Sequence, residues 1–319
     1  MIGRATSDLH LTPKTAEWVF SALRELREDA EERGGFTVLV GDIFDQPKTV
    51  DMPTFNRLRD MVQAWPSSLT IIAGNHDQYD GKRNALEALA GGSCRVISEP
   101  TVTDIGLCVP YLPPSTFWQE IEGLTADVWW THQGWRGSYL NNMRRDTDGL
   151  DCGRMTAKLC VSGHYHAPQN IGPIIYCGSP YQTTFAEEGQ IKGWLAWDGE
   201  LRPRRIPFEQ VMAPRHWTVE WQHGEKPVIP EGYRDGDKVR IVTTASRDEV
   251  KKSKAIRQAG LSGASIVSRS NNAERVTISD EGSPFEKACE YTRRVFGTDA
   301  QRPDPESLRE WAEQAALWG

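Results

Sequence analysis

The chain has 319 residues, of which 38% are hydrophobic and 25% are charged, and its formal net charge is −7. A chain of this length holds one large domain or two smaller ones, and we expect two. No apolar run approaches the roughly 20 residues of a membrane-spanning helix, so we expect no contact with a membrane. The acidic balance argues mildly against a nucleic-acid partner, because phosphate binding favours a basic face. Net charge does not, however, say how the charges are distributed.

The cysteines and the first residues bear on the cellular compartment. The six cysteines are scattered, without a CxxC pair, and we interpret them as reduced thiols. Cys108, Cys160 and Cys177 have strand-like surroundings, in which we expect them to be buried. Residues 1–10 contain no apolar segment of the kind that signal peptides carry. We therefore expect a cytoplasmic protein.

The first part of the chain alternates between buried strands and amphipathic helices. Thr12 as N-cap and Pro13 in the first helical position predict a helix that ends at Gly34. Asp51 and Pro53 open a second helix in the same way. The apolar runs that predict strands here lie at 2–7, 36–40 and 69–73. Strands alternating with helices are typical of a layered α/β fold, in which ligands bind beyond the carboxyl ends of the strands.

The pattern changes after Phe208. Before it we expect further strands at 96–98, 107–109, 127–131, 158–162, 174–177, 193–197 and 201–206. After it, alternating apolar positions with a charged helix over 247–259 and strands near 266 and 276 predict a small α+β unit, followed by helices over 284–296 and 305–317. The predicted domains are therefore 1–208, 209–283 and 284–319.

Polar residues follow the predicted strands of the first domain in a recurring way. Five of the seven histidines lie in or beside short motifs, each directly after an apolar segment. These motifs are Asp8-Leu9-His10, Gly41-Asp42-Ile43-Phe44-Asp45, Gly74-Asn75-His76-Asp77, His132 and Gly163-His164-Tyr165-His166. Imidazole nitrogens together with carboxylate and amide oxygens form a ligand set that suits Mn, Fe or Zn. We interpret the set as a two-metal site for phosphoester hydrolysis.

Such a site needs a carboxylate that bridges both ions and neutral ligands that add little negative charge beside an anionic substrate. Asp42 is the candidate bridge. We assign Asp8, His10 and His166 to one metal, and Asn75, His132 and His164 to the other.

His76 directly follows a proposed ligand, and we assign it to protonating the leaving oxygen and stabilising charge on the phosphorane. Asp77 or Asp45 would orient the neighbouring groups. Each motif alone has a simpler explanation, since Gly and Asp favour turns and Asp-x-His occurs by chance. Their occurrence together and in this order favours the metal site.

This ordered set resembles the calcineurin-like metallophosphoesterase superfamily, and the motifs cover most of residues 1–170. A narrower similarity follows at Tyr-Cys-Gly-Ser-Pro-Tyr over 176–181, with Phe185, Glu188, Gly189 and Lys-Gly-Trp over 192–194. These residues resemble the SbcD nuclease family, which is related to the eukaryotic meiotic-recombination-eleven nuclease and to its short bacteriophage versions.

The resemblance implies a layered α/β metallophosphoesterase core, made of two sheets flanked by helices, with a small α+β capping domain and C-terminal helices. It implies a manganese-dependent DNA nuclease with 3′ to 5′ exonuclease and single-strand or hairpin endonuclease activity, acting in repair and recombination inside a bacterial cell or a phage-infected host. The implied partners are DNA, an SMC-like ABC ATPase subunit (SbcC-like) and a second copy of the chain. The helix over 305–317 would dock on the ATPase or pack on its own domain.

Two other functions stay open. The first is a small-substrate phosphodiesterase or phosphomonoesterase on the same scaffold. Protein phosphatases of the superfamily carry an arginine where this chain has Gln46, which weakens that branch. The second is a metal-binding scaffold for the ATPase without catalysis. Every proposed ligand is present, so nothing in the sequence favours a loss of chemistry.

The segment 133–149 follows a proposed ligand and mixes aromatic residues with arginines. Its candidate DNA contacts are Trp135, Arg136, Tyr139, Arg144 and Arg145. Aromatic rings stack on exposed bases, and guanidinium groups bind phosphates, so this composition suits single-stranded DNA. An ordinary long surface loop is the alternative.

Overall fold

The computed structural model describes residues 2–46, 48–80, 83–261 and 263–268. The chain divides into two compact units. The first consists of Met1–Thr218 with Pro230–Val239, and the second of Val219–Ile229 with Arg240–Gly319. Among the described residues, none of the helices combines the length and the apolar composition that a membrane span requires.

The first sheet of unit 1 has the strand order β12-β11-β1-β2-β3-β4. Its strands are β1 (Ile2–Thr6), β2 (Phe36–Val40), β3 (Ser68–Ile72), β4 (Cys94–Ile97), β11 (Gly193–Asp198) and β12 (Arg204–Pro207). The four strands from β1 to β4 are parallel, whereas β11 and β12 add to the β1 edge in antiparallel pairs. The carboxyl ends of β1, β2 and β3 therefore lie at one edge of the sheet.

The second sheet has the order β5-β6-β7-β8-β10-β9. Its strands are β5 (Thr101–Thr103), β6 (Gly106–Val109), β7 (Val128–His132), β8 (Leu159–Gly163), β9 (Gln169–Ile171) and β10 (Ile174–Tyr176). Strands β6, β7, β8 and β10 are parallel, and the two outer strands are antiparallel. Strands β7 and β8 thus end side by side, as β1, β2 and β3 do in the first sheet.

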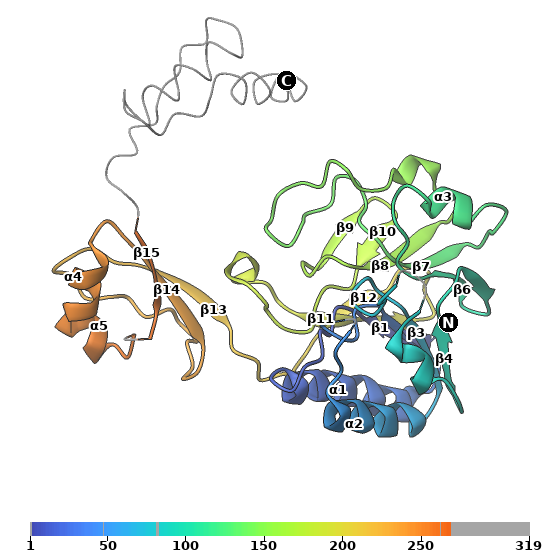
Figure 1. The fold of residues 1–319 in the computed structure, drawn as a ribbon, viewed down its shortest axis with the longest axis horizontal. Helices are drawn as coiled ribbons and strands as arrows, with labels where there is room; N and C mark the ends of the chain where they lie inside the picture. The colour runs from blue at the N-terminus through green and yellow to red at the C-terminus, as the bar shows by residue number, and fades with distance from the viewer. Residues whose placement is uncertain (1, 47, 81–82, 262, 269–319) are drawn as a thin grey trace, which may run out of the picture. The chain divides into compact units, whose positions relative to one another are not determined.

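Three hydrophobic clusters define the layers of unit 1. One lies between the two sheets and joins residues such as Val38, Val161 and Leu195. A second joins α1 (Ala16–Arg33) and α2 (Met52–Gln63) to the outer face of the first sheet (Figure 1). The third covers the outer face of the second sheet with α3 (Phe117–Glu120) and loops. Unit 1 is therefore a layered α/β core of two mixed sheets flanked by helices, as the resemblance implied.

The first helix begins later than the sequence pattern predicts. Helix α1 has Thr15 as its N-cap residue, and Thr12 belongs to the preceding turn. The two threonines bond to each other, since the Thr12 amide donates to Thr15 Oγ1 at 2.9 Å. The Thr15 hydroxyl in turn donates to the His10 carbonyl at 2.9 Å. The two threonines thus stabilise the turn that follows His10. Because Thr12 belongs to that turn, the helix begins only after Thr15. Gly34 ends the helix as predicted, with φ +63°.

Unit 2 and its boundary contain a three-stranded sheet in the order β13-β14-β15. The elements are β13 (His216–Glu220), β14 (Lys238–Thr243), α4 (Arg247–Lys252), α5 (Lys254–Gln258) and β15 (Ser265–Ser268). The single helix predicted over 247–259 is wrong, because Ser253 adopts an extended backbone with ψ 120° and caps α5 through the Ile256 amide. Strand β15 is parallel to β14. The strand predicted near 276 and the helices over 284–296 and 305–317 lie outside the described residues, and the predicted domain limits stay predictions.

Short 3-10 helices complete the described secondary structure at η1 (Ala85–Leu89), η2 (Cys152–Arg154) and η3 (Phe185–Glu187). The cysteines Cys108, Cys160 and Cys177 are fully buried in unit 1, as the sequence indicated. Burial raises the pKa of each of these thiols, so none is a reactive thiolate at neutral pH.

Trp130 fills the space between the two sheets. Its side chain is 1% exposed and packs against Phe36 and Trp197. Its indole nitrogen donates to the Ile105 carbonyl at 2.9 Å. Replacing Trp130 with alanine should lower the free energy of unfolding by about 3 to 5 kcal/mol, because a large cavity opens in the core. Urea denaturation followed by circular dichroism measures the change.

The matched control is Val102→Ala on β5, where the side chain is 51% exposed. Its effect should stay within about 0.5 kcal/mol. Equal stabilities of the two variants would contradict the assignment of Trp130 to the core between the sheets.

Candidate metal centre

The residues singled out by the sequence motifs meet where the parallel strands of both sheets end. Asp8 and His10 follow β1, Asp42 follows β2, and Asn75 and His76 follow β3. His132 ends β7, while His164 and His166 follow β8. The sequence therefore predicts the convergence of segments that are far apart in the chain. Neither sheet alone holds the set.

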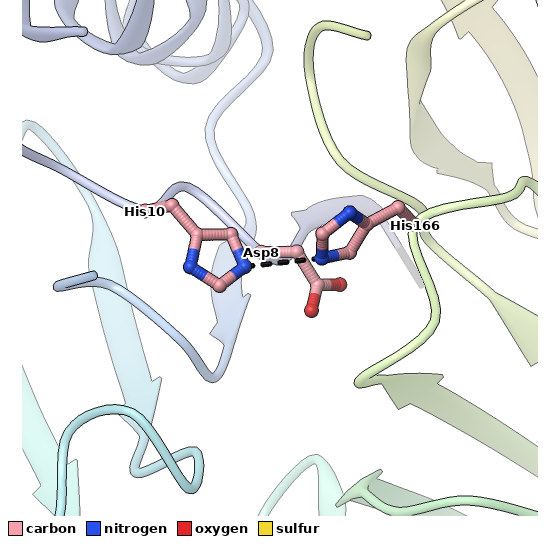
Figure 2. A group of neighbouring side chains, drawn as sticks. All are labelled: Asp8, His10 and His166. Carbon is pink, nitrogen blue, oxygen red and sulfur yellow. Dashed lines mark hydrogen bonds between the residues drawn. The ribbon is translucent and has the colours of Figure 1, made fainter. Parts of the chain in front are cut away.

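One group joins Asp8, His10 and His166, whose ligand atoms all lie within 4.8 Å of one another. The Nε2 atoms of His10 and His166 are 3.1 Å apart. Figure 2 shows the two imidazoles facing each other, with the Asp8 carboxylate beside them. Asp8 is fully buried and also accepts a hydrogen bond from the His164 amide at 3.0 Å. The carboxylate is thus held in place between two strand ends.

A second group joins Asp8, Asp42 and His132, and a third joins His10, Asp42 and His76. Asp42 Oδ2 lies 3.2 Å from His132 Nε2 and 3.9 Å from His10 Nε2. It is therefore within reach of both halves of the site, where a bridging carboxylate has to be. Burial alone would raise the pKa of Asp42, but the surrounding histidines hold it below its usual value.

The orientation of His132 leaves one ring nitrogen directed at carboxylate oxygens. Its Nδ1 donates to the Val40 carbonyl at 2.7 Å. Nε2 is buried and, among the described residues, has no hydrogen-bond partner. A lone pair facing the Asp42 carboxylate is repelled unless a cation lies between them. Burial lowers the pKa of His132, but Asp42 and Asp8 outweigh it and raise the pKa to about 9. This position demands positive charge, from a proton or from a metal ion.

Glycines next to the ligands make this close packing possible. A Cβ atom on Gly41 would overlap the His132 imidazole, and φ there is +83°. A Cβ on Gly74 would overlap the backbone and carboxylate of Asp42. The Gly-Asp and Gly-Asn pairs of the motifs are therefore required by contact between neighbouring turns.

The backbone at several proposed ligands is strained. In the part of the chain that the structure describes, the non-glycine residues with positive φ are Asp8, His10, Asp42, His164 and Met143. Such conformations cost about 1 to 3 kcal/mol each and concentrate at functional sites. All but Met143 are proposed metal ligands. The strained positions thus coincide with residues that meet at the common centre.

His164 and Asn75 lie together beside the second group. The His164 Nδ1 and Asn75 Oδ1 atoms are 3.0 Å apart, and the His164 and His132 ring centroids are 5.4 Å apart. Burial and the neighbouring His132 lower the pKa of His164 to about 4. A neutral imidazole keeps its lone pair, which a metal ligand needs. Tyr111, which the motifs do not include, packs against His164, and the two ring centroids are 5.7 Å apart.

His76 is half-buried at the rim of the site. Its amide donates to Asp42 Oδ1 at 2.9 Å, and its Nδ1 lies 2.7 Å from the Asp45 carbonyl oxygen. The Asp45 carboxylate instead approaches His10 Nδ1 at 3.4 Å. Asp45 thus orients two histidines, one through its backbone and one through its side chain.

Asp77 ties two of the turns together. It is 1% exposed and accepts hydrogen bonds from the amides of Phe44 at 2.9 Å and Gly74 at 2.8 Å. Burial and the charge of Asp42 raise the pKa of Asp77 to about 7. Asp77 does not face the centre, so it positions the loops that carry Asp42 and Asn75.

The segment 135–150 borders the site, and one of the predicted contacts in it is wrong. Trp135 is fully buried in the cluster behind the second sheet, so it does not stack on DNA bases. Arg136, Arg144 and Arg145 are exposed, and the Arg145 guanidinium lies 4.3 Å from the centre of the Tyr139 ring.

This segment is attached to the metal centre. Asn141 Oδ1 accepts a hydrogen bond from the His166 amide at 2.7 Å, and the Tyr165 hydroxyl donates to Asp146 at 2.6 Å. The exposed arginines are therefore placed on a loop whose two anchors lie next to proposed ligands. Sequence alone does not distinguish the buried Trp135 from an exposed stacking residue, because both are tryptophans beside polar positions.

The donor set fits divalent metal ions. Imidazole nitrogens, carboxylates and an amide converge from two sheets, and a buried nitrogen faces carboxylates with no bonded partner in the described residues. Mixed nitrogen and oxygen donors suit first-row metals such as Mn, Fe and Zn. The geometry thus supports holding divalent ions at the position that the motifs predict.

A family profile and a phage protein both match the sequence of this chain. The profile of the family described as calcineurin-like phosphoesterase matches residues 5–168. Exonuclease subunit 1 of Enterobacteria phage T4 is 26% identical over an alignment of 225 residues, and the match covers 63% of this chain and 66% of that protein. The chain thus spans just under two thirds of the length of this relative.

Two solved structures are also similar. Nuclease MPE from Pseudomonas putida has 16% sequence identity and a TM-score of 0.30, and the match covers 54% of this chain and 66% of that one. YfcE, a phosphoesterase from E. coli, has 14% identity and a TM-score of 0.33, and the match covers 66% of this chain and 100% of that one.

Replacing Asp42 with alanine should abolish binding of both metal ions, because its carboxylate is within reach of both ligand groups. The number of ions bound after dialysis is measured by elemental analysis. Asp60→Ala on α2, where the side chain is 68% exposed, is the matched control and should bind as the parent protein does. Two ions retained by the Asp42 variant would exclude the bridging role.

Proposed function

Because this chain belongs to the calcineurin-like phosphoesterase family, we propose that it is a DNA nuclease that hydrolyses phosphodiester bonds with two divalent ions, most suitably manganese. The observation that carries the proposal is the convergence of Asp8, Asp42 and the histidines from both sheets. The similarity to an exonuclease subunit of phage T4 supports DNA as the substrate.

The chemistry divides between the ions and the chain. Two divalent ions would activate water for attack and neutralise the charge that develops on the attacking and leaving oxygens at phosphorus. Asp8, His10 and His166 would hold one ion, Asn75, His132 and His164 the other, and Asp42 both. The chain's own contribution to the substrate is then orientation and proton transfer.

We propose His76 as the general acid. The Asp45 carbonyl accepts the Nδ1 proton. The acid is therefore the doubly protonated ring, which would transfer its second proton from Nε2 and keep the proton on Nδ1. The ring is only partly buried, which leaves it accessible from solvent. Proton donation to the leaving oxygen accelerates such reactions by about 10²- to 10⁴-fold. Asp45 and Asp77 act through the groups that they orient.

The phage T4 relative also bears on the partners of this chain. The phage relative is named as a subunit, which implies a complex for that protein. For this chain we propose an SMC-like ABC ATPase as partner, a homodimer of the nuclease, and a role in DNA repair or recombination. The predicted docking helix over 305–317 lies outside the described residues.

The test of the function is the release of nucleotides from end-labelled linear DNA with Mn, compared with Mg and with EDTA. Cleavage that depends on Mn supports the proposal. Turnover of bis-p-nitrophenyl phosphate without DNA cleavage would instead favour the small-substrate phosphodiesterase. Two bound metals without turnover of either substrate would favour the scaffold.

His76→Ala should bind both metals and lose about 10²- to 10⁴-fold in the rate of DNA cleavage, because it removes the acid and no ligand. Single-turnover kinetics with saturating Mn measures the rate, and elemental analysis measures the metal. Loss of a metal ion from this variant would place His76 in the ligand group with His10 and Asp42.

The exposed arginines of the anchored loop provide a separate test. The double variant Arg144→Gln/Arg145→Gln should bind DNA more weakly, and the slope of log affinity against log salt should fall by about 2 for duplex DNA. Arg24→Gln/Arg27→Gln on α1 removes the same charge elsewhere and is the matched control. Equal salt slopes for both variants and the parent would exclude the loop as a phosphate contact.

A further inference from the structure

The connection from β10 to β11 forms a supporting layer behind the proposed ligands. Two contacts hold the backbone of the ligand turns. The Tyr181 hydroxyl donates to the Leu9 carbonyl at 2.8 Å. The Lys192 ammonium donates to the His166 carbonyl at 2.9 Å. This connection thus reaches the turns at His10 and His166, the two residues whose Nε2 atoms face each other.

A third contact reaches the His166 side chain. Its Nδ1 lies 2.9 Å from Thr183 Oγ1. The Thr183 hydroxyl donates to Glu187 Oε1, which itself lies 3.4 Å from His166 Nδ1. Glu187 is fully buried, although its neighbour Glu188 is only partly buried. A buried carboxylate is therefore linked to a proposed metal ligand through one hydroxyl group.

The two oxygens of Glu187 have different partners. Oε2 accepts a hydrogen bond from Lys192 Nζ at 2.6 Å, while Oε1 faces Thr183 and His166. Lys192 Nζ is also within 3.2 Å of Ser179 Oγ and 3.1 Å of Gln190 Oε1. Lys192 thus fixes the carboxylate through Oε2, and Oε1 is directed at Thr183 and the histidine.

This arrangement determines the tautomer of His166. The Thr183 proton is committed to the carboxylate, because Glu187 has no proton to give. Thr183 Oγ1 then accepts from His166 Nδ1, which must carry the imidazole proton. The lone pair of the neutral ring is consequently on Nε2, the atom that faces His10 Nε2 at 3.1 Å. A metal ligand at that position needs this form of the ring.

We propose that Thr183 and Glu187 are positioning residues that hold His166 in the Nδ1-protonated, metal-binding form, and that Lys192 holds Glu187 for this task. The proposal rests on the proposed function in one respect, namely that His166 is a metal ligand. Outer partners of metal-bound histidines orient the ring and raise its basicity, and their loss typically costs 10- to 100-fold in metal affinity.

A purely structural ion pair is the alternative to this proposal. Buried pairs such as Glu187 and Lys192 are weak evidence for stability, because desolvation offsets their attraction. A structural pair, however, gives Thr183 no role in metal binding. Thr183→Val separates the two explanations, since it removes the hydroxyl, keeps the shape of the side chain and leaves the ion pair intact.

The experiment measures Mn²⁺ binding by calorimetry in the absence of DNA, with the full chain. In Thr183→Val, one of the two Mn²⁺ ions should bind about 10- to 100-fold more weakly, because His166 loses the acceptor that fixes its ring. Thr183→Ser keeps the hydroxyl and should restore the parent affinity. The unfolding midpoint in EDTA should be close to that of the parent for both variants.

Glu187→Gln should likewise weaken the binding of one of the two Mn²⁺ ions and not the other. Glu188→Gln is its matched control. The Glu188 carboxylate accepts a hydrogen bond from the Thr218 amide at 2.7 Å, away from the chain of contacts to His166. Two ions bound with parent affinity by Thr183→Val would overturn the proposal and leave the metal centre standing. A parent protein that binds no divalent ion would overturn the metal centre, and the role of His166 with it.

Discussion

The constraint on which the rest of the structure depends is the burial of two carboxylates, Asp8 and Asp42, side by side. Their exposed fractions are 0% and 2%. Buried charges of one sign are costly unless cations compensate them. Histidines from both sheets and the divalent ions that we propose supply that compensation. The strained turns, the adjacent glycines and the convergence of strand ends are the means by which one chain brings these groups together.

The centre depends on the packing of the two sheets because each sheet carries part of it. His132 ends a strand of the second sheet, yet its Nδ1 donates to the Val40 carbonyl of the first sheet and its Nε2 faces Asp42. A displacement between the sheets would change both contacts at once. The apolar cluster between the sheets, with Trp130 and Leu195 in it, therefore sets the geometry of the ligands as well as the stability of unit 1.

Around this centre the chain builds supporting contacts from segments without metal-binding motifs. Thr15 donates to the His10 carbonyl, and Asn141 accepts from the His166 amide. Asp77 joins the turn after β2 to the turn after β3. The connection from β10 to β11 supports the turns at His10 and His166. Ligands on turns have little rigidity of their own, so this outer set of contacts decides how far each donor can move.

The sequence by itself determined the strands of the core closely and identified the motifs that meet at the centre, because buried strands are apolar and polar residues at their ends break the pattern. It did not determine the start of α1, where a hydroxyl pair competes with the helix, or the burial of Trp135. From the sequence we also named Glu188 and not Glu187, since two adjacent acids look alike in sequence. Only the tertiary structure decided which of them is buried beside Lys192 and His166, because that choice depends on contacts between residues distant in the chain.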